Sequence, residues 1–192
     1  MKSSIDALHL LQHRRSSKKF GNIAPNKEQL EAILKAGLRV PDHGHLKPYH
    51  FVVIEKSGME TFHQYLRSVV DEFGLDDEMY KKASKLSERA PMVIGVVAKI
   101  AKDIAKVPAW EQMLTAGCAT YAMQLAANAQ GFETCWISGK WVNGSAIRNA
   151  FGCGEFDKIV ALVMIGSPQD DECGISLASH TEEIGNVVSY IR

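Results

Sequence analysis

Residues 91–100, Pro-Met-Val-Ile-Gly-Val-Val-Ala-Lys-Ile, are the strongest strand signal in the sequence. The run is rich in β-branched residues and does not alternate with polar ones, so it predicts a central strand that is buried on both faces. Three further strands are predicted at 50–55, 134–138 and 158–166. Helical patterns separate these strands, which indicates an α/β or α+β core in which helices cover a sheet.

The helices are predicted from apolar residues that recur at three- and four-residue spacing. The first helix is expected to begin at Ser3 or Ser4, and others are expected over 58–73, 78–89, 108–130 and 144–151. The second helix opens with the capping box 26–29, and Pro41 follows its end. Its expected buried face consists of Leu30, Ile33, Leu34 and Leu38.

Glycines mark the ends of two of these helices. Gly131 follows the long helix and Gly152 follows the short one, for which Asn143 is the candidate N-cap. The long helix is rich in small residues, which suits either a central core helix or a helix that contacts another subunit. The predicted order is helix, helix, strand, helix, helix, strand, helix, strand, helix, strand, followed by a polar tail with a weak closing segment at 187–191. No linker divides the chain, so one domain over 1–192 is expected.

Composition excludes several classes of function. The 192 residues contain 22 Lys and Arg against 22 Asp and Glu, a formal net charge of zero. That balance argues against a dedicated nucleic-acid binder and against an anchor on an anionic membrane. The apolar runs are too short to span a bilayer, and the first residues lack the layout of a signal peptide. The cysteines, at 118, 135, 153 and 173, are widely spread, so a reducing cytoplasm is the expected location.

The first candidate site is the run Arg14-Arg15-Ser16-Ser17-Lys18-Lys19, called here the basic segment (residues 14–19). Two guanidinium groups, two hydroxyls and two amines suit a phosphate, which arginine binds as a fork. The same cations could instead complement the dipole at the end of the first helix.

The second candidate is the loop that follows Arg39. Asp42, His43, His45 and His50 could form a metal site of two histidines and one carboxylate. Loop histidines that are hydrogen-bonded locally are the simpler interpretation. A third interpretation places Arg39 and His43 beside a planar or anionic ligand.

The third candidate is 130–139, where a helix stops at a glycine and a short strand ends in Trp136-Ile137-Ser138-Gly139. Such a strand end can offer backbone amides and small side chains to a flat ligand, or it can be a core tryptophan followed by a turn. Cys135 has no evident paired base, which favours an inert thiol over a nucleophile. The sequence also lacks a G-x-G-x-x-G turn, a phosphate-binding P-loop and a G-x-S-x-G elbow.

Taken together, these segments resemble the nitroreductase family, in particular its short bacterial members of the NAD(P)H nitroreductase type. The segments that carry the resemblance, in chain order, are 13–20, 34–43, 47–51, 106–112, 116–119, 129–132, 136–139 and 151–153. The resemblance implies an α+β fold with a mainly antiparallel sheet flanked by helices. It also implies an intertwined homodimer that binds FMN at the subunit interface, with the long helix at the contact between subunits.

The resemblance also implies roles for particular residues. Arg14, Arg15 and Ser16 would hold the FMN phosphate and its polar neighbours, and Lys18 would lie near the N1/O2 edge of the flavin. The other cofactor-binding positions that it implies are Arg39 and His43 from the second subunit, and Trp136, Ile137, Ser138 and Gly139 along the cofactor.

Two further residue assignments come from the same resemblance. Gln130 and Gly131 would help to seat the nicotinamide. Related chains often carry Arg where this one has Ile137, so Lys140 could supply that charge.

The activity implied is that of an FMN-dependent oxidoreductase. NADH or NADPH would reduce bound FMN and leave, and a nitroaromatic or quinone-like acceptor would then take the electrons at the same place. The flavin carries the chemistry, so no protein catalytic residue and no metal are expected. The alternatives are a non-catalytic flavin-binding or flavin-sensing protein, and a metal-dependent enzyme that uses Asp42, His43, His45 and His50.

Overall fold

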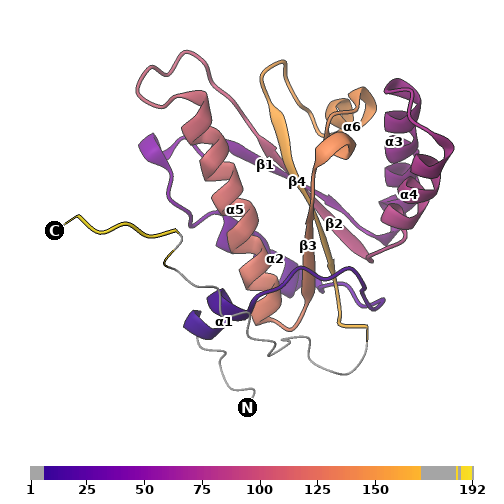
Figure 1. The fold of residues 1–192 in the computed structure, drawn as a ribbon, viewed down its shortest axis with the longest axis horizontal. Coiled ribbons are helices and arrows are strands. Elements are labelled where there is room, and N and C mark those ends of the chain that lie inside the picture. The colour runs from indigo at the N-terminus through magenta and orange to yellow at the C-terminus, as the bar shows by residue number, and fades with distance from the viewer. Residues whose placement is uncertain (1–6, 170–184, 186, 192) are drawn as a thin grey trace.

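The computed structural model describes residues 7–169, 185 and 187–191 (Figure 1). Its elements, in chain order, are α1 (Ala7–His13), α2 (Lys27–Gly37), the 3-10 turn η1 (His43–His45), β1 (Tyr49–Ile54), η2 (Lys56–Gly58), α3 (Met59–Glu72), α4 (Asp77–Ser87), β2 (Met92–Ala98), α5 (Ala109–Ala129), β3 (Glu133–Ile137), η3 (Gly139–Val142), α6 (Ser145–Ala150) and β4 (Lys158–Gly166). The order of helices and strands confirms the predicted order. The expected start of the first helix, at Ser3 or Ser4, lies outside the described residues.

The four strands form one sheet in the order β1-β2-β4-β3, and every neighbouring pair is antiparallel. The run 91–100 supplies β2, which is buried at every position and lies in the middle of the sheet, as predicted. β1 and β3 are the two edge strands. The fold is therefore α+β with an antiparallel sheet.

Helices cover both faces of this sheet (Figure 1). Helices α2 and α5 pack on one face, around Ile33, Met123 and Ile94. Helices α3, α4 and α6 cover the other face, around Phe62 and Phe151. Because helices cover both faces of the sheet, β2 has no solvent-exposed side. This explains why polar and apolar residues do not alternate along its sequence.

Three local predictions about the helices were tested by the structure. The capping box of α2 is present: the Asn26 side chain accepts from the Gln29 backbone N–H, and the Gln29 side chain accepts from the Asn26 N–H.

The assignment of Leu38 to the buried face was wrong, because Leu38 follows the helix end and is 52% exposed. Gly37 is buried there instead, and an added Cβ would lie 3.0 Å from Met123 Cγ. α2 therefore approaches α5 closely at this glycine.

The predicted cap of α6 was also wrong. Gly144 occupies the N-cap position, and the Asn143 side chain donates to the Gly139 carbonyl instead. The Glu72 carboxylate of α3 accepts from the Ser145 backbone N–H at 2.7 Å and from its hydroxyl at 2.9 Å. A carboxylate from another helix thus replaces the local cap that the sequence pattern indicated.

The sequence analysis predicted a weak closing segment at 187–191. Residues 187–191 form no helix or strand within this chain, and Val187 and Ile191 are largely exposed. In the described part of the chain, no helix combines the length and the apolar character that crossing a bilayer would need.

Gly95 in β2 offers a direct test of how the second face is packed. A Cβ added to Gly95 would overlap the ring of Phe151, with 2.8 Å to its Cζ, and Phe151 is buried at 3% exposed. We expect Gly95→Ala to lower the free energy of unfolding by about 1–3 kcal/mol, measured by urea denaturation. Phe151→Leu in the Gly95→Ala background should recover part of that loss. An unchanged stability in Gly95→Ala would contradict this packing.

Candidate functional site

The basic segment lies along the free edge of the sheet. The Ser17 backbone N–H donates to the Thr134 carbonyl of edge strand β3 at 2.9 Å. Further on, the Gly21 N–H donates to the Ser167 carbonyl and the Ser167 N–H donates to the Ile23 carbonyl, both at 2.8 Å. The segment is therefore fixed to the sheet although it forms no helix or strand. Two of the three candidate sites, 14–19 and 134–139, come together at this edge.

Among the described residues, the cations of the basic segment have no acidic partner. Arg15, Lys18 and Lys19 are exposed, and the Arg14 guanidinium lies over the ring of Tyr121 on α5, 5.9 Å from its centroid. Arg14 Nη1 is 3.5 Å from the Ser16 hydroxyl. Within residues 7–169, no salt bridge involves any of these four cations.

The pKa of the Cys135 thiol on β3 depends on the positive charges around this strand. Burial raises its pKa, while the charges of Arg89, Lys18 and Arg14 act in the opposite direction. Arg89 lies between α4 and β2, far from the basic segment in sequence. The sequence analysis missed this residue, because a single arginine outside any motif carries no signal of its spatial neighbours.

The end of β3 divides into a packed part and an exposed part. The Trp136 indole N–H donates to the Val160 carbonyl at 3.1 Å, and its ring packs against the core on the α5 face. Ser138 and Gly139 are exposed, and Gly139 turns the chain with a φ of 73°. Ile137, the last residue of the strand, is partly buried and packs on the opposite face. The residues available to a ligand here are those that follow the strand.

Gln130 and Gly131 directly follow the last residue of α5. The Gln130 amide donates to the Ala126 carbonyl at 3.1 Å and to the Gln29 carbonyl of α2 at 3.3 Å. Gly131 has a φ of 86°, as expected for a glycine after a helix. These contacts join α5 to α2, and no described hydrogen bond joins Gln130 to the basic segment.

The loop that follows Arg39 is organised by Asp42. Its carboxylate accepts from the backbone N–H groups of Leu46 at 3.2 Å and Lys47 at 2.7 Å. Gly44, His45 and Lys47 have φ values of 74°, 54° and 47°, so the loop contains two non-glycine residues in the left-handed region. Such backbone conformations persist only where the surroundings hold them in place, and here the Asp42 carboxylate does so.

The metal interpretation of this loop finds no support in the geometry. The described residues contain no group of three or more His, Cys, Asp or Glu side chains arranged to hold a metal ion. The Asp42 carboxylate is engaged with the loop backbone, and His43 Nδ1 lies 2.7 Å from Glu111 Oε2 of α5. The proposed ligands therefore do not converge on one centre.

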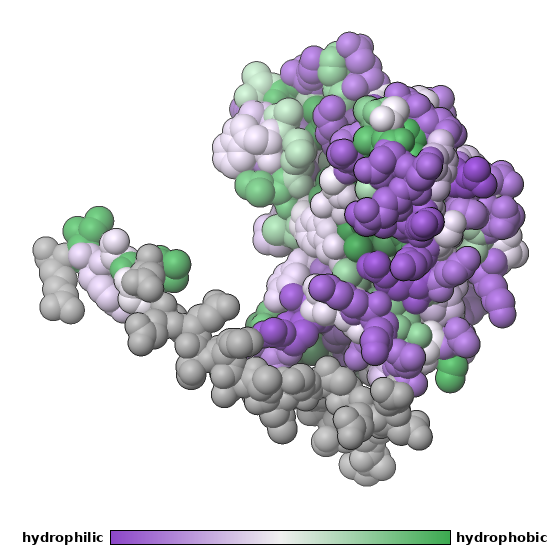
Figure 2. Space-filling model, turned by 45° about the vertical axis from the view of Figure 1, so that its right-hand side comes forward, coloured by the Kyte–Doolittle hydropathy of each residue, from purple (hydrophilic) through white to green (hydrophobic). Residues whose placement is uncertain are grey.

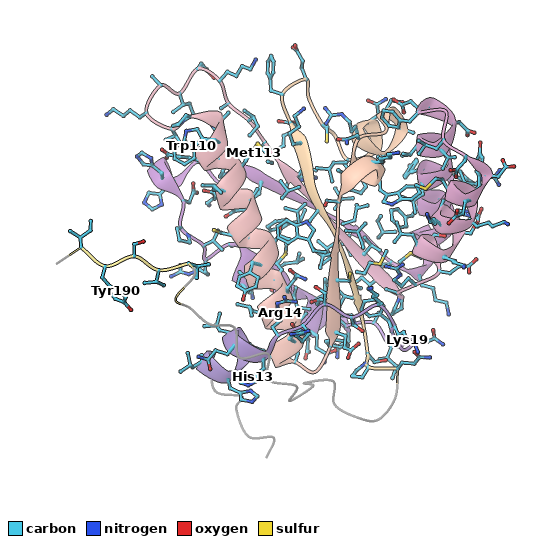
Figure 3. The ribbon with its side chains drawn as sticks, in the orientation of Figure 1. His13, Arg14, Lys19, Trp110, Met113 and Tyr190 are labelled. Atoms are coloured by element: carbon cyan, nitrogen blue, oxygen red, sulfur yellow. The ribbon has the colours of Figure 1, made fainter. Side chains whose placement is uncertain are left out.

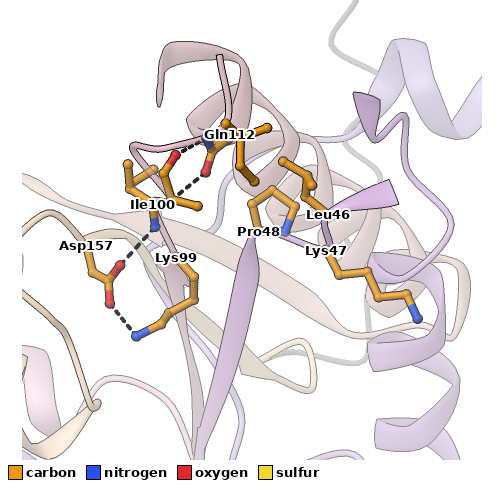
Figure 4. Close-up of a pocket in the computed structure, with 9 residues that line it drawn as sticks. Leu46, Lys47, Pro48, Lys99, Ile100, Gln112 and Asp157 are labelled. Atoms are coloured by element: carbon orange, nitrogen blue, oxygen red, sulfur yellow. Dashed lines mark hydrogen bonds and ion pairs between the residues drawn. The ribbon is translucent and has the colours of Figure 1, made fainter. Parts of the chain in front are cut away.

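A small cavity of about 290 Å³ lies beside this loop, between Leu46, Pro48, Ile100 and Ile104 (Figure 4). Asp157 lies at its side, where its carboxylate is paired with Lys99 and accepts from the Ile100 N–H at 2.9 Å. Burial alone would raise the pKa of Asp157, but its hydrogen bonds with Lys99 and two backbone N–H groups outweigh this and lower it. These contacts hold the segment between β2 and α5.

The two polar regions lie at opposite ends of α5. Figure 3 shows Arg14 beside the C-terminal half of α5, whereas Trp110 and Met113 mark its other end, where His43 contacts Glu111. A helix of 21 residues is about 30 Å long. Within one chain, His43 therefore lies at the opposite end of α5 from the basic segment.

The comparisons with known proteins agree with this architecture. A crystal structure of a nitroreductase-like family protein from Bacillus cereus superposes with a TM-score of 0.82 at 20% identity, over 100% of this chain and 98% of that one. A nitroreductase from Bacteroides fragilis, solved with bound FMN, has a TM-score of 0.73 at 19% identity, over 96% and 98% of the two chains. The fold is that of the nitroreductases.

The sequence comparisons identify the family. The sequence model of the Nitroreductase family matches residues 11–167. A Haemophilus influenzae protein is 60% identical over 163 residues, 85% of this chain and 89% of that protein. An Escherichia coli K12 protein is 48% identical over 165 residues, 86% and 90% of the two chains, and both carry the description "Putative NAD(P)H nitroreductase". The chain belongs to the nitroreductase family.

The role of Asp42 in this loop gives a testable expectation. Asp42→Ala removes the acceptor of two backbone N–H groups, so we expect it to lower the free energy of unfolding by about 1–3 kcal/mol in urea denaturation. Asp42→Asn keeps one oxygen acceptor and should retain part of the stability. If metal-free Asp42→Ala were as stable as the unaltered chain, the carboxylate would not be the support of this loop.

Proposed function

We propose that this protein is an FMN-dependent oxidoreductase. It passes electrons from NADH or NADPH through bound FMN to nitroaromatic or quinone-like acceptors, which bind in alternation with the nicotinamide. The observation that carries the proposal is the basic segment, which the Ser17 to Thr134 hydrogen bond fixes along β3 and whose cations form no salt bridge among the described residues. The relatives described as NAD(P)H nitroreductases and the FMN-bound structure of similar fold support it.

The donor set of this edge suits the phosphate of FMN. Arg14 and Arg15 supply guanidinium groups, Ser16 a hydroxyl and Lys18 an amine, and none of the three cations has a described acidic partner. A phosphate dianion is stabilised by several charged donors that no carboxylate already neutralises. The basic segment would hold the phosphate, and the exposed residues after Trp136 would line the cofactor.

The second part of the proposal is a homodimer that is joined along α5. Four large apolar residues are exposed on this helix at spacings of three, one and seven residues: Trp110, Met113, Leu114 and Tyr121. Residues so spaced share one side of a helix. The side formed by α3 and α4 is dominated by hydrophilic residues, whereas hydrophobic ones gather along the opposite edge of the view in Figure 2. A second copy is the partner that would cover this side.

Gly117 supports the same contact. It lies in the middle of the exposed side of α5, and nothing in the described chain lies within 4 Å of the position its Cβ would take. A glycine inside a helix is about 1 kcal/mol less favourable than alanine, and no contact with the described residues accounts for a glycine here. The close approach of a second α5 helix would explain why a glycine occupies this position.

A two-fold pairing of α5 helices would also complete the site. The contact is isologous, and an antiparallel pairing of the two helices places the N-terminal end of one beside the C-terminal half of the other. His43 of one copy would then lie near the basic segment of its partner, and we propose Arg39 as a second cofactor-binding residue of that copy. The exposed side chains of Val187, Val188 and Ile191 are further apolar surface for an intertwined contact.

Within this assembly the residues of the chain bind and orient the cofactor and its substrates. Bound FMN supplies the redox chemistry, taking electrons from the nicotinamide and giving them to the acceptor. Arg14, Arg15 and Ser16 hold the phosphate, and Lys18 places a positive charge near the cofactor. A positive charge near a flavin favours its anionic reduced form, so the chain promotes reduction without a protein acid or base.

The proposed activity is tested by the absorbance of the flavin. We expect purified protein loaded with FMN to absorb near 450 nm (roughly, for an oxidised flavin) and to bleach when NADH or NADPH is added without oxygen. Addition of a nitroarene or a quinone should then restore the absorbance. Bleaching by neither nicotinamide would contradict the proposal, and FMN binding without turnover of any acceptor would indicate a flavin-binding or flavin-sensing protein.

The phosphate site is tested by removing one of its cations. Arg14→Ala should weaken FMN binding by about 1.5–3 kcal/mol, or about 10- to 150-fold in Kd, because a hydrogen bond to a charged group is lost. The measurement is the quenching of FMN fluorescence at equilibrium. Lys81→Ala on α4 removes the same charge from a remote exposed site and serves as the control. Equal Kd values for the two variants would place the phosphate elsewhere.

A further inference from the structure

The contact between His43 and Glu111 joins the loop that follows Arg39 to the N-terminal end of α5. His43 Nδ1 lies 2.7 Å from Glu111 Oε2, although the residues are 68 positions apart in the sequence. The His43 side chain is 59% exposed and that of Glu111 27% exposed. Exposed ion pairs contribute little to stability, so the stability of the fold does not explain this contact.

The first turn of α5 holds the Glu111 carboxylate in a fixed place. The next residue, Gln112, is 1% exposed, and its side chain makes hydrogen bonds to both backbone groups of Ala101 and to the Val107 carbonyl. The Glu111 N–H itself donates to the Pro108 carbonyl at 3.0 Å. Gln112 thus fastens this turn to the segment that follows β2, and Glu111 points from it toward the loop.

The loop does not need Glu111 in order to keep its shape. The Asp42 carboxylate already accepts from the Leu46 and Lys47 N–H groups. It thereby supports the left-handed backbone conformations of this loop. What Glu111 adds is the orientation of one ring. An ionised carboxylate only accepts hydrogen bonds, so the hydrogen lies on His43 Nδ1.

The other ring nitrogen faces away from the contact. No hydrogen bond of His43 Nε2 is found among the described residues, and in the neutral ring this atom keeps a lone pair. The ring is thereby fixed both in orientation and in tautomer, next to the exposed side of α5 that carries Trp110. Ring nitrogens fixed by a carboxylate in this way are typical of histidines that act on a ligand.

We propose that Glu111 is a positioning residue for His43. It selects the Nδ1–H tautomer and presents Nε2 to the FMN that is held by the basic segment of a second copy of the chain. This inference rests on the proposed function, because it needs the cofactor and the dimer described above. It assigns a role to Glu111, which binds neither the cofactor nor the substrate itself.

The first test measures the tautomer and needs no cofactor. In protein labelled with ¹⁵N-histidine, the resonances of His43 are identified among the seven histidines by their loss in His43→Ala. At a pH above the range in which histidine titrates, we expect the Nδ1–H tautomer in the unaltered chain and the Nε2–H tautomer in Glu111→Ala. Glu111→Gln should restore Nδ1–H, because its amide oxygen still accepts. An Nε2–H tautomer in the unaltered chain, or no change in Glu111→Ala, overturns the inference.

The second test asks whether Glu111 acts through His43. Glu111→Ala should raise the Kd for FMN about 3- to 10-fold, as for one misplaced hydrogen bond, and Glu111→Gln should recover most of the affinity. In a His43→Ala background, Glu111→Ala should have no further effect. Glu31→Ala, which removes the acid of the exposed Glu31–Lys35 pair, is the matched control and should leave Kd unchanged.

The two tests separate the two proposals. An equal effect of Glu111→Ala with and without His43 would show that Glu111 acts otherwise, and would overturn the inference while FMN binding stands. If the unaltered chain binds no FMN, the proposed function fails, and the presentation of Nε2 to the cofactor fails with it. In that case, the tautomer measurement still decides whether Glu111 orients the ring.

Discussion

β2 is buried at every position and β4 along most of its length, and this burial dictates how the other elements are arranged. Two central strands without a polar side require helices above and below the sheet, and the chain supplies α2 and α5 on one face and α3, α4 and α6 on the other. α5 packs on its face of the sheet through small and apolar residues such as Ala116, Ala119 and Met123, while Trp110, Met113, Leu114 and Tyr121 on the same helix are exposed.

The edges of the sheet are where this architecture is open to ligands. β3 has a free edge, and the basic segment covers it through the Ser17 N–H and the Thr134 carbonyl. The loop of His43 is fastened to the other end of α5, through Glu111. One chain therefore holds two polar regions at the two ends of a single helix, and the two-fold pairing of α5 that we propose would bring the two regions together.

The sequence predicted those features that depend on neighbouring residues. The order of the elements, the capping box at Asn26 and the glycine at 131 follow from local patterns, and the structure confirms them. The predictions for Leu38 and Asn143 were wrong, because the packing of α2 and a carboxylate from α3 overrode the local signal. The contact of Glu111 spans 68 residues, so no local pattern could reveal it. The residues of the basic segment were recognised from their own chemistry, but only the structure places the segment along β3.

The claim that two chains share each FMN site is tested most directly by mixing subunits. Arg14→Ala and His43→Ala chains carrying different tags are expressed together, and the heterodimer is isolated and titrated with FMN. We expect one site of unaltered affinity per heterodimer, formed by the basic segment of the His43→Ala chain and the loop of the Arg14→Ala chain. The other site should be weaker than in either homodimer. A heterodimer whose sites only match those of the two homodimers, or a chain that binds FMN as a monomer, would contradict it.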